Sequence, residues 1–407
     1  MALEPLRARF PALARFQGGR PCVFADAPGG TQAPLDVIHA MASYLERSNA
    51  NTGGAFATSK ETDALIGEAR EAAADLVGAQ PGEIVFGQST TTLAFALSRA
   101  IGRTLRAGDE VVVTRLDHDA NVAPWRAVAE DTGATLRWVD VRAEDCTLDL
   151  ATLAGALSER TRVVAFTLAS NAVGTITPAA EIVRLVHGAG ALAVADGVHF
   201  VPHRLADFGA SGLDVMFCSA YKFYGPHLGI MAARAELLDS WRPYRVRPSP
   251  EHGPEAWETG TLSHEALAGL VAAVRYMGSV GGGTNGTRSD LRAGMEAIEA
   301  HERELTVRFL RGVEAVPGAR LFGIADPRRA HERTPTFALR LGAQHPRRSA
   351  EALAERGVFA WDGDYFAVEI MERLGLEETG GALRIGYCHY NTNEEVDRVL
   401  DYLRAIG

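Results

Sequence analysis

The sequence has few cysteines and lacks both long apolar runs and an excess of positive charge. Its four cysteines, Cys22, Cys146, Cys218 and Cys388, are widely separated and form no CxxC pair, so neither a zinc knuckle nor a disulfide framework is expected. No stretch reaches the length of a transmembrane helix, and the N-terminal residues contain no apolar run of signal-peptide length. We therefore expect a cytoplasmic protein that has no membrane partner.

The charge balance narrows the classes of partner. Lysine and arginine number 41 against 51 aspartate and glutamate residues, which gives a formal net charge of −10 at pH 7. An acidic protein is a poor match for nucleic acid or for an anionic membrane surface. Hydrophobic residues make up 47% of the chain and charged residues 23%, a composition typical of a globular enzyme with a sizeable core. A small-molecule substrate is the class of partner that remains.

Short β-rich runs alternate with helical periodicity over the first two thirds of the chain. Helices are expected at 34–47, 62–78 and 90–103. Strands are expected at 83–87, 109–114, 134–141, 161–170, 191–196, 213–219 and 228–233. Strands that alternate with helices indicate an α/β fold with a mostly parallel, seven-stranded type of sheet.

The pattern changes after about residue 260. A helix at 263–277, a glycine-rich break at 278–290 and a long helix at 288–314 precede strands at 335–341, 357–361 and 380–386. The last helix opens at Thr392, with Glu395 completing a capping box. We therefore predict a large domain at 1–262 and a smaller α+β domain at 263–407.

The glycine-rich break contains a formal G-x-G-x-x-G at Gly281, Gly283 and Gly286. A dinucleotide site requires this motif between a strand and a helix, whereas here it follows a helix. We interpret the segment as a hinge or linker, and a dehydrogenase function is not supported.

Lys222 and Asp196 each stand at the end of an apolar, strand-like run. Taken singly, each is an ordinary strand-end residue, since lysines are usually exposed and aspartates often cap turns. Together they provide the two groups that pyridoxal 5′-phosphate (PLP) requires. The lysine amine can form a Schiff base with the cofactor aldehyde, and the carboxylate can keep the pyridine nitrogen protonated so that the ring accepts electrons.

Three consecutive hydroxyl residues, Ser89, Thr90 and Thr91, lie between an expected strand and an expected helix. Hydroxyls and free backbone N–H groups at a helix N-terminus can hold a phosphate. Simple capping of the helix is the alternative, but a cap needs only one such side chain.

Two further polar residues follow expected strands. His118 can stack on a flat cofactor ring, or it can be a surface residue or part of a metal site with its neighbouring aspartates. We expect no metal, because no second cluster of ligands occurs at a helical or strand spacing. Asn171 can bond a phenolic oxygen of the cofactor, or it can shape the turn before Gly174.

The order of these residues and of the segments around them along the chain resembles the class V aminotransferase superfamily of fold-type I PLP enzymes, and most closely its cysteine desulfurase and selenocysteine lyase branch. The resemblance extends over essentially the whole chain. It rests on 25–34 (ADAPGGTQAP), 89–92 (STTT), 116–125 (LDHDANVAPW), 170–175 (SNAVGT), 195–199 (ADGVH), 219–226 (SAYKFYGP), 258–261 (ETGT) and 383–400 (LRIGYCHYNTNEEVDRVL).

The resemblance implies a role for each matching residue. Lys222 holds the cofactor as an internal aldimine and moves the Cα proton, Asp196 pairs with the pyridinium nitrogen, and His118 stacks over the ring. Arg384 holds the substrate α-carboxylate, and Thr261 reaches the phosphate of the neighbouring subunit in a homodimer. The remaining cofactor contacts are Asn171 and His199 near the phenolic oxygen, and Ser89, Thr90, Thr91, Ser219 and Tyr221 around the phosphate. The family usually has glutamine at the position of His199, and often histidine at that of Tyr221.

The sequence departs from the desulfurase pattern in two loops. Phe366 falls about where a desulfurase carries its persulfide-forming cysteine, and no cysteine lies between Cys218 and Cys388. The segment at 49–59 lacks the histidine and arginine that relatives commonly have there. We expect an altered substrate-facing loop with candidates Trp361, Asp362, Asp364 and Tyr365, unless Asp362 and Gly363 only form a structural turn.

We therefore expect a PLP-dependent enzyme that binds an α-amino acid as an external aldimine and removes its Cα proton with Lys222. The favoured outcome is a desulfurase-like C–S lyase that works by β-elimination without a catalytic cysteine. An aminotransferase or an amino-acid epimerase shares the same first steps. A PLP-binding protein without turnover is a further alternative, against which the retention of Arg384 argues.

Overall fold

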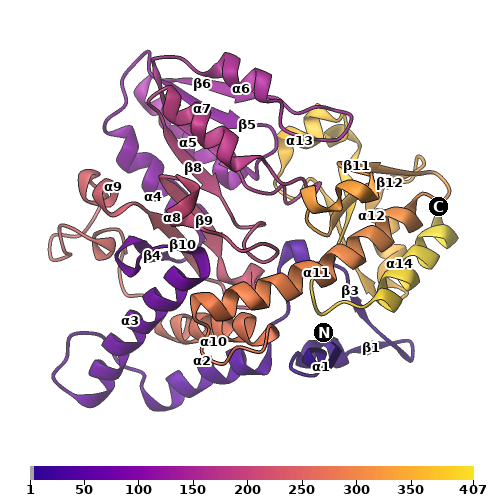
Figure 1. The fold of residues 1–407 in the computed structure, drawn as a ribbon, viewed down its shortest axis with the longest axis horizontal. Helices are drawn as coiled ribbons and strands as arrows, with labels where there is room; N and C mark the ends of the chain where they lie inside the picture. Colours follow the sequence, from indigo (N-terminus) through magenta and orange to yellow (C-terminus); the bar gives the residue numbers. More distant parts are fainter. Residues whose placement is uncertain (1–3) are drawn as a thin grey trace.

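The computed structural model describes residues 4–407, and its centre is a seven-stranded sheet (Figure 1). The strand order is β4-β10-β9-β8-β7-β5-β6, in which only β10 runs antiparallel to its neighbours. The strands are β4 (Ile84–Gly87), β5 (Glu110–Thr114), β6 (Thr135–Val139), β7 (Thr161–Thr167), β8 (Leu192–Asp196), β9 (Val215–Ser219) and β10 (Gly229–Ala233). All seven expected strands are present, and the α/β fold with a mostly parallel sheet is confirmed.

Helices cover both faces of this sheet, so its strands are apolar on both sides. Along β5, Val111 and Val113 face one cluster of apolar side chains, whereas Val112 faces the other. The first cluster includes residues of α4 (Thr90–Gly102) and α5 (Ala123–Thr132). The second includes residues of α3 (Ala57–Val77), α7 (Ala179–Gly188) and α10 (His264–Val280). Alternation of side chains along an extended strand therefore decides which helix layer each valine contacts.

A second sheet, to the right in Figure 1, lies in the C-terminal part of the chain. Its antiparallel order is β11 (Ala319–Phe322), β12 (Thr336–Leu341), β15 (Ala382–Gly386) and β14 (Trp361–Gly363). Its core is shared with α11 (Arg288–Val313), α12 (Pro346–Ala354) and α14 (Asn393–Ile406). Thr392 and Glu395 form the expected capping box at the start of α14. Strand β11 was not expected from the sequence.

The N-terminal segment contacts this second sheet. Strand β3 (Val23–Phe24) pairs in parallel with β13 (Val358–Phe359), and Val23 belongs to the apolar core of the smaller sheet. Helix α10 packs against α2 (Leu35–Arg47) and α3. The division at 262/263 stays a prediction, and residues 1–3 of the predicted large domain lie outside the described residues.

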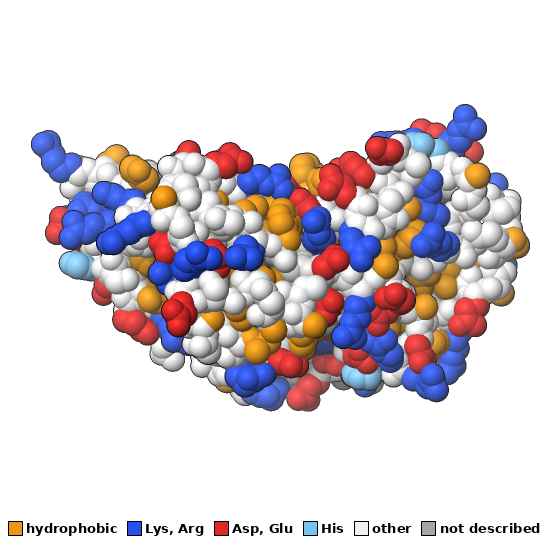
Figure 2. Space-filling view, turned by 90° about the horizontal axis from the view of Figure 1, so that it is seen from above, with side chains coloured by type: hydrophobic (Ala, Val, Ile, Leu, Met, Phe, Trp, Pro, Cys, Tyr) orange, Lys and Arg blue, Asp and Glu red, His pale blue; other side chains and the backbone are white. Residues whose placement is uncertain are grey.

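The remaining elements are short. They are α1 (Glu4–Arg7), β1 (Phe16–Gln17), β2 (Arg20–Pro21), α6 (Leu150–Ala156), α8 (Phe208–Ser211), α9 (Ala235–Ser240), α13 (Val368–Arg373) and eight 3₁₀ turns. Within residues 4–407, no helix combines the length and the apolar character needed to cross a bilayer. Seen from above, the molecule is hollowed between its left and right parts, and apolar side chains gather near the hollow (Figure 2).

One close approach between neighbouring elements shapes the start of α4. A Cβ atom at Gly229, the first residue of β10, would overlap the backbone of Ser89 and Thr90. Only glycine therefore lets the turn between β4 and α4 lie against the end of β10.

We predict that Gly229→Ala lowers the free energy of unfolding by about 1–3 kcal/mol, because the added methyl group must displace backbone. Gly67→Ala is the matched control. Gly67 lies inside α3 with open space around its missing Cβ, so alanine there should stabilise by roughly 0.5–1 kcal/mol. Urea unfolding of both variants measures the difference. Equal stabilities of the two variants would contradict the role assigned to Gly229.

Candidate active site

A single pocket opens at the carboxyl ends of the parallel strands, where α/β sheets commonly bind ligands. Strand β8 ends at Asp196 and β9 at Ser219, and the turn that follows β9 carries Lys222. Ten residues predicted from the sequence line this pocket: Ser89, Thr90, Thr91, His118, Asn171, Asp196, His199, Ser219, Tyr221 and Lys222. The pocket is also lined by Ala120, Thr167, Ala169 and Val198, which the sequence did not single out.

Lys222 is held so that its neutral amine form is available near pH 7. Burial lowers the pKa of the amine from 10.5 to about 7, and the nearby Arg384 cation adds to the effect while Asp196 opposes it. The amine donates a hydrogen bond to the carbonyl oxygen of Pro28. Lys222 and Lys60 are the only lysines of the sequence. A neutral primary amine is the form that attacks an aldehyde or accepts a proton.

Asp196 presents a carboxylate to the same pocket from the end of β8. Its Oδ1 accepts a hydrogen bond from the N–H of Val198 at 2.8 Å, and no donor within residues 4–407 reaches Oδ2. Burial raises the pKa of Asp196 to about 6, although Lys222 acts in the opposite direction. A protonated ring nitrogen placed at Oδ2 would favour the ionised form, so the residue suits a pyridinium partner.

The hydroxyl cluster lies at the N-terminus of α4. The Ser89 side chain accepts a hydrogen bond from the N–H of Thr92 at 3.1 Å and so caps the helix. Thr90 Oγ1 lies 2.5 Å from Ser219 Oγ, which joins the turn to the end of β9. The capping interpretation therefore applies to Ser89. Because the whole N-terminus of a 13-residue helix opens onto the pocket, it also suits a bound phosphate.

His118 offers the flat face of a neutral imidazole. Its Nδ1 accepts a hydrogen bond from the N–H of Ala120 at 3.0 Å, which places the ring proton of the neutral form on Nε2. Burial, together with the cations of Lys222 and Arg384, lowers the pKa of His118 to about 4. The ring is therefore uncharged at neutral pH.

His199 connects the pocket to the smaller sheet. Its Nε2 lies 3.1 Å from Thr334 Oγ1 and 2.9 Å from Thr336 Oγ1, and Thr336 begins β12. Burial, assisted by the fields of His203, Lys222 and Arg384, holds the pKa of His199 well below 6.5. Sequence reasoning named His199 but not its threonine partners, which lie more than 130 residues away.

Arg384 lies on β15 beside the pocket rather than in its lining. The guanidinium donates to the carbonyl oxygen of Asn171 at 2.9 Å and lies 4.2 Å above the ring of Tyr365. Burial lowers the pKa of Arg384 to about 10, so it remains a cation at neutral pH. Its Nε has no hydrogen-bond partner within residues 4–407, which leaves donor capacity for an anion.

Asp26 is a neighbour of Arg384 that sequence reasoning missed. Burial raises its pKa to about 6, with the arginine acting in the opposite direction, and its buried Oδ1 accepts no hydrogen bond within the described residues. An isolated aspartate before a Pro-Gly turn gives no signal of this contact. In the sequence, Asp26 stood out only as part of the segment 25–34, which supports the family resemblance.

The other substrate-loop candidates lie at varying distances from the pocket. Trp361 on β14 is half exposed and packs against Gly29, while Asp362 forms an ion pair with Arg347 at 3.2 Å. Neither residue lines the pocket. Tyr365 lies under the guanidinium of Arg384, beside the pocket. Phe366 stacks on His118, which lines the pocket, with 5.6 Å between the ring centroids.

Thr261 lies away from the pocket of its own chain. It lines a separate groove together with Asn51, Thr52, Arg70 and His264. No group of three or more His, Cys, Asp or Glu side chains with metal-binding geometry is found among residues 4–407.

Comparisons with known proteins agree with this geometry. The aminotransferase class-V family profile matches residues 23–399. The chain belongs to this family. It is 32% identical to a probable cysteine desulfurase 2 of Mycobacterium leprae over 99% of this chain and 96% of the relative. It is 31% identical to an uncharacterized protein of Mycobacterium tuberculosis over 97% and 99%.

Solved structures show the same fold. The apo cysteine desulfurase of Thermococcus onnurineus matches with a TM-score of 0.88 and 24% identity, covering 100% of this chain and 98% of the other. The cysteine desulfurase CsdA of Escherichia coli matches with a TM-score of 0.85 and 25% identity, covering 98% and 97%. The family resemblance, a PLP-dependent enzyme and PLP as its cofactor are thereby confirmed. The roles of the individual site residues stay predictions.

We predict that borohydride reduction of the PLP-loaded protein fixes the cofactor to the peptide that contains Lys222. Lys60 is the internal control, because it is the only other lysine and lies in α3 outside the pocket. Peptide mass spectrometry distinguishes the two sites. Label on Lys60, or none after loading, would overturn the assignment.

The lowered pKa of Lys222 predicts how attachment depends on pH. Only the neutral amine attacks the aldehyde, so the attachment rate should rise as pH increases through about 7 and then level off. Stopped-flow absorbance of the apoprotein mixed with PLP measures this rate. A rate that still rises steeply between pH 9 and 10 would indicate a lysine with an ordinary pKa.

Proposed function

We propose that the protein is a PLP-dependent C–S lyase that releases a thiol from Cβ of an α-amino acid by elimination, without an enzyme thiol. With one water consumed, a thioether R–S–CH₂–CH(NH₃⁺)–COO⁻ yields a thiol, pyruvate and ammonium. The observation that carries the proposal is a pocket lined by Lys222 and Asp196, with Arg384 beside it, that has no cysteine in its lining.

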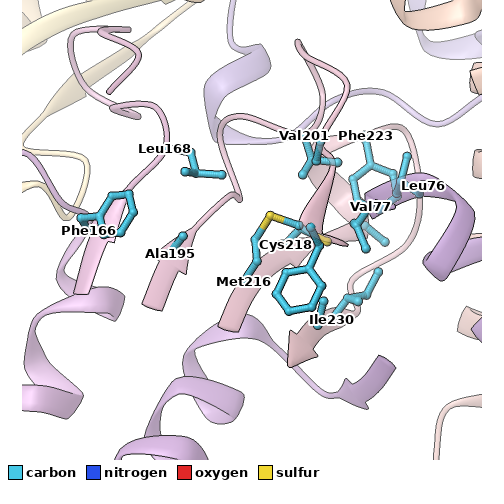
Figure 3. Packing of buried hydrophobic residues seen from close by; sticks show 14 of the residues in the cluster. Leu76, Val77, Phe166, Leu168, Ala195, Val201, Met216, Cys218, Phe223 and Ile230 are labelled. Atoms are coloured by element: carbon cyan, nitrogen blue, oxygen red, sulfur yellow. The ribbon is translucent and has the colours of Figure 1, made fainter. Parts of the chain in front are cut away.

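The four cysteines are unsuited to act as sulfur acceptors. All are buried, with exposed fractions of 0–1%. Cys218, on β9, lies among apolar side chains such as Met216 and Ile230 (Figure 3). Burial raises the pKa of Cys146 to about 11 and shifts those of Cys218 and Cys388 upward as well. A persulfide-forming cysteine needs the opposite: an exposed thiol with a low pKa.

The chain's own residues supply the remaining steps. PLP, when bound, provides an electron-accepting ring that acidifies the Cα proton of an attached amino acid. Lys222, whose neutral form is available near pH 7, would take that proton at Nζ. Arg384 would hold the α-carboxylate with its free donors, and Asp196 would keep the ring nitrogen protonated through Oδ2. The protonated Lys222 can then return the proton on the way to product.

A homodimer is part of this proposal. Thr261 is exposed and lines a groove separate from its own chain's pocket, which fits a residue that serves the pocket of a second subunit. The carboxylate of Glu258, three residues earlier, pairs with Arg70 and accepts from the N–H of Phe86, so the base of this segment is fixed to the large sheet.

Mixing two impaired variants tests the dimer. Lys222→Ala removes the base, and Thr261→Ala should weaken cofactor retention in the neighbouring subunit. In a mixed dimer, the pocket of the Thr261→Ala subunit keeps its own Lys222 and receives an intact Thr261 from the Lys222→Ala subunit. Mixing the two variants after partial unfolding should therefore restore activity above that of either variant alone. No restoration, or an active monomer in sedimentation, would contradict the arrangement.

The elimination itself is tested by alkylation and product analysis. Because all four thiols are buried, we predict that iodoacetamide leaves the native enzyme active and that no persulfide accumulates on the protein during turnover. Pyruvate and ammonium should form together with a free thiol from S-substituted cysteines, and together with thiocysteine, released into solution, from cystine.

Unfolding the protein in urea before alkylation is the control, because it should expose and modify all four cysteines. Inactivation of the native enzyme with modification of Cys388 alone would identify a thiol-dependent desulfurase. A keto acid that retains the substrate side chain would indicate an aminotransferase, and a racemised substrate an epimerase.

A further inference from the structure

Phe366 presents an aromatic ring to solvent at the edge of the pocket. Its side chain is 69% exposed, whereas the preceding Tyr365 is 9% exposed. The Phe366 ring stacks on His118, which lines the pocket, with an interplanar angle of 23°. A single exposed apolar side chain is common on protein surfaces, but this one lies against a residue that lines the ligand pocket.

The loop that carries Phe366 is fixed in a costly conformation. Tyr365 and Phe366 have φ values of 60° and 56°, a region that bulky residues rarely adopt. Hydrogen bonds hold them there: Asn171 Nδ2 donates to the Tyr365 carbonyl at 2.9 Å, and the N–H of Asp119 donates to the Phe366 carbonyl at 2.6 Å. The Tyr365 hydroxyl donates to the carbonyl of Ala382. Strained residues held by their surroundings are concentrated at functional sites.

The loop adjoins the groups that would hold a substrate. Arg384, which would hold the α-carboxylate, lies 4.2 Å above the ring of Tyr365. Phe366 stacks on His118, which lines the same pocket as Lys222. A substrate with its carboxylate at Arg384 and its Cα at Lys222 would then have room to direct its Cβ substituent along His118 towards Phe366.

We propose that Phe366 is a specificity-determining residue that receives an apolar S-substituent, so that the substrates are S-alkyl and S-aryl cysteines rather than free cysteine. This inference rests on the proposed elimination and names its substrate class. Asp364 accepts from the N–H of Phe366 at 2.8 Å, and its carboxylate disfavours an anionic substituent at this place. Glu369, three residues after Phe366, is paired with Arg115 and Arg126, so these charges are compensated and a neutral apolar group fits best.

The test compares two substrates that differ only in the S-substituent, S-benzylcysteine and S-methylcysteine. For the parent enzyme, kcat/KM for pyruvate release should favour the benzyl compound. Phe366→Gly removes the ring and suits the positive φ, so the variant should fold. It should lower the benzyl-to-methyl ratio at least 10-fold, because the substituent loses its apolar contact.

Two further variants make the comparison specific. Phe366→Leu keeps an apolar side chain and should give an intermediate ratio. Phe16→Ala removes an equally exposed phenylalanine, 64% exposed on β1, and should leave the ratio unchanged. An unchanged ratio in Phe366→Gly, or a parent enzyme that prefers free cysteine, would overturn the assignment of Phe366 while leaving elimination intact. Absence of pyruvate with every substrate would instead overturn the proposed function.

Discussion

A primary amine buried beside a buried guanidinium is the constraint on which the site depends. Lys222 and Arg384 are both taken out of water, and the Arg384 cation further lowers the pKa of Lys222. Burial lowers the pKa values of both groups, but only that of Lys222 reaches the neutral range. The same burial therefore yields one amine whose neutral form, a nucleophile and base, is available near pH 7, and one cation that can hold a carboxylate.

The fold holds this pair in place from two directions. Lys222 follows β9 of the large sheet, while Arg384 belongs to β15 of the smaller sheet. His199, bonded to Thr334 and Thr336, and Arg384, bonded to Asn171, join the two sheets across the pocket. A change in how the two sheets pack would alter the distance between Lys222 and Arg384. The pKa of the Lys222 amine therefore depends on the position of both sheets.

The sequence predicted the parts of the site that local patterns encode. Lys222 and Asp196 were found because each ends an apolar strand, and Ser89 because hydroxyls precede a helix. The electrostatic influence of Arg384 on Asp26 and the hydrogen bond between His199 and Thr336 join residues far apart in the chain, and no local sequence pattern predicts them. Trp361 and Asp362 lie on β14, which pairs with β15, and neither of them lines the pocket. Strand β11 was missed because it has only four residues, one of which is the exposed Arg320.

The central claim is that Lys222 moves the Cα proton of an amino acid held by Arg384. Alanine has no leaving group on Cβ, so its exchange of the Cα proton in ²H₂O isolates this step from elimination. Nuclear magnetic resonance of alanine incubated with the PLP-loaded enzyme should show deuterium at Cα with the parent and none with Lys222→Ala that still binds the cofactor. Exchange by that variant at the parent's rate would show that another group is the base and would contradict the account.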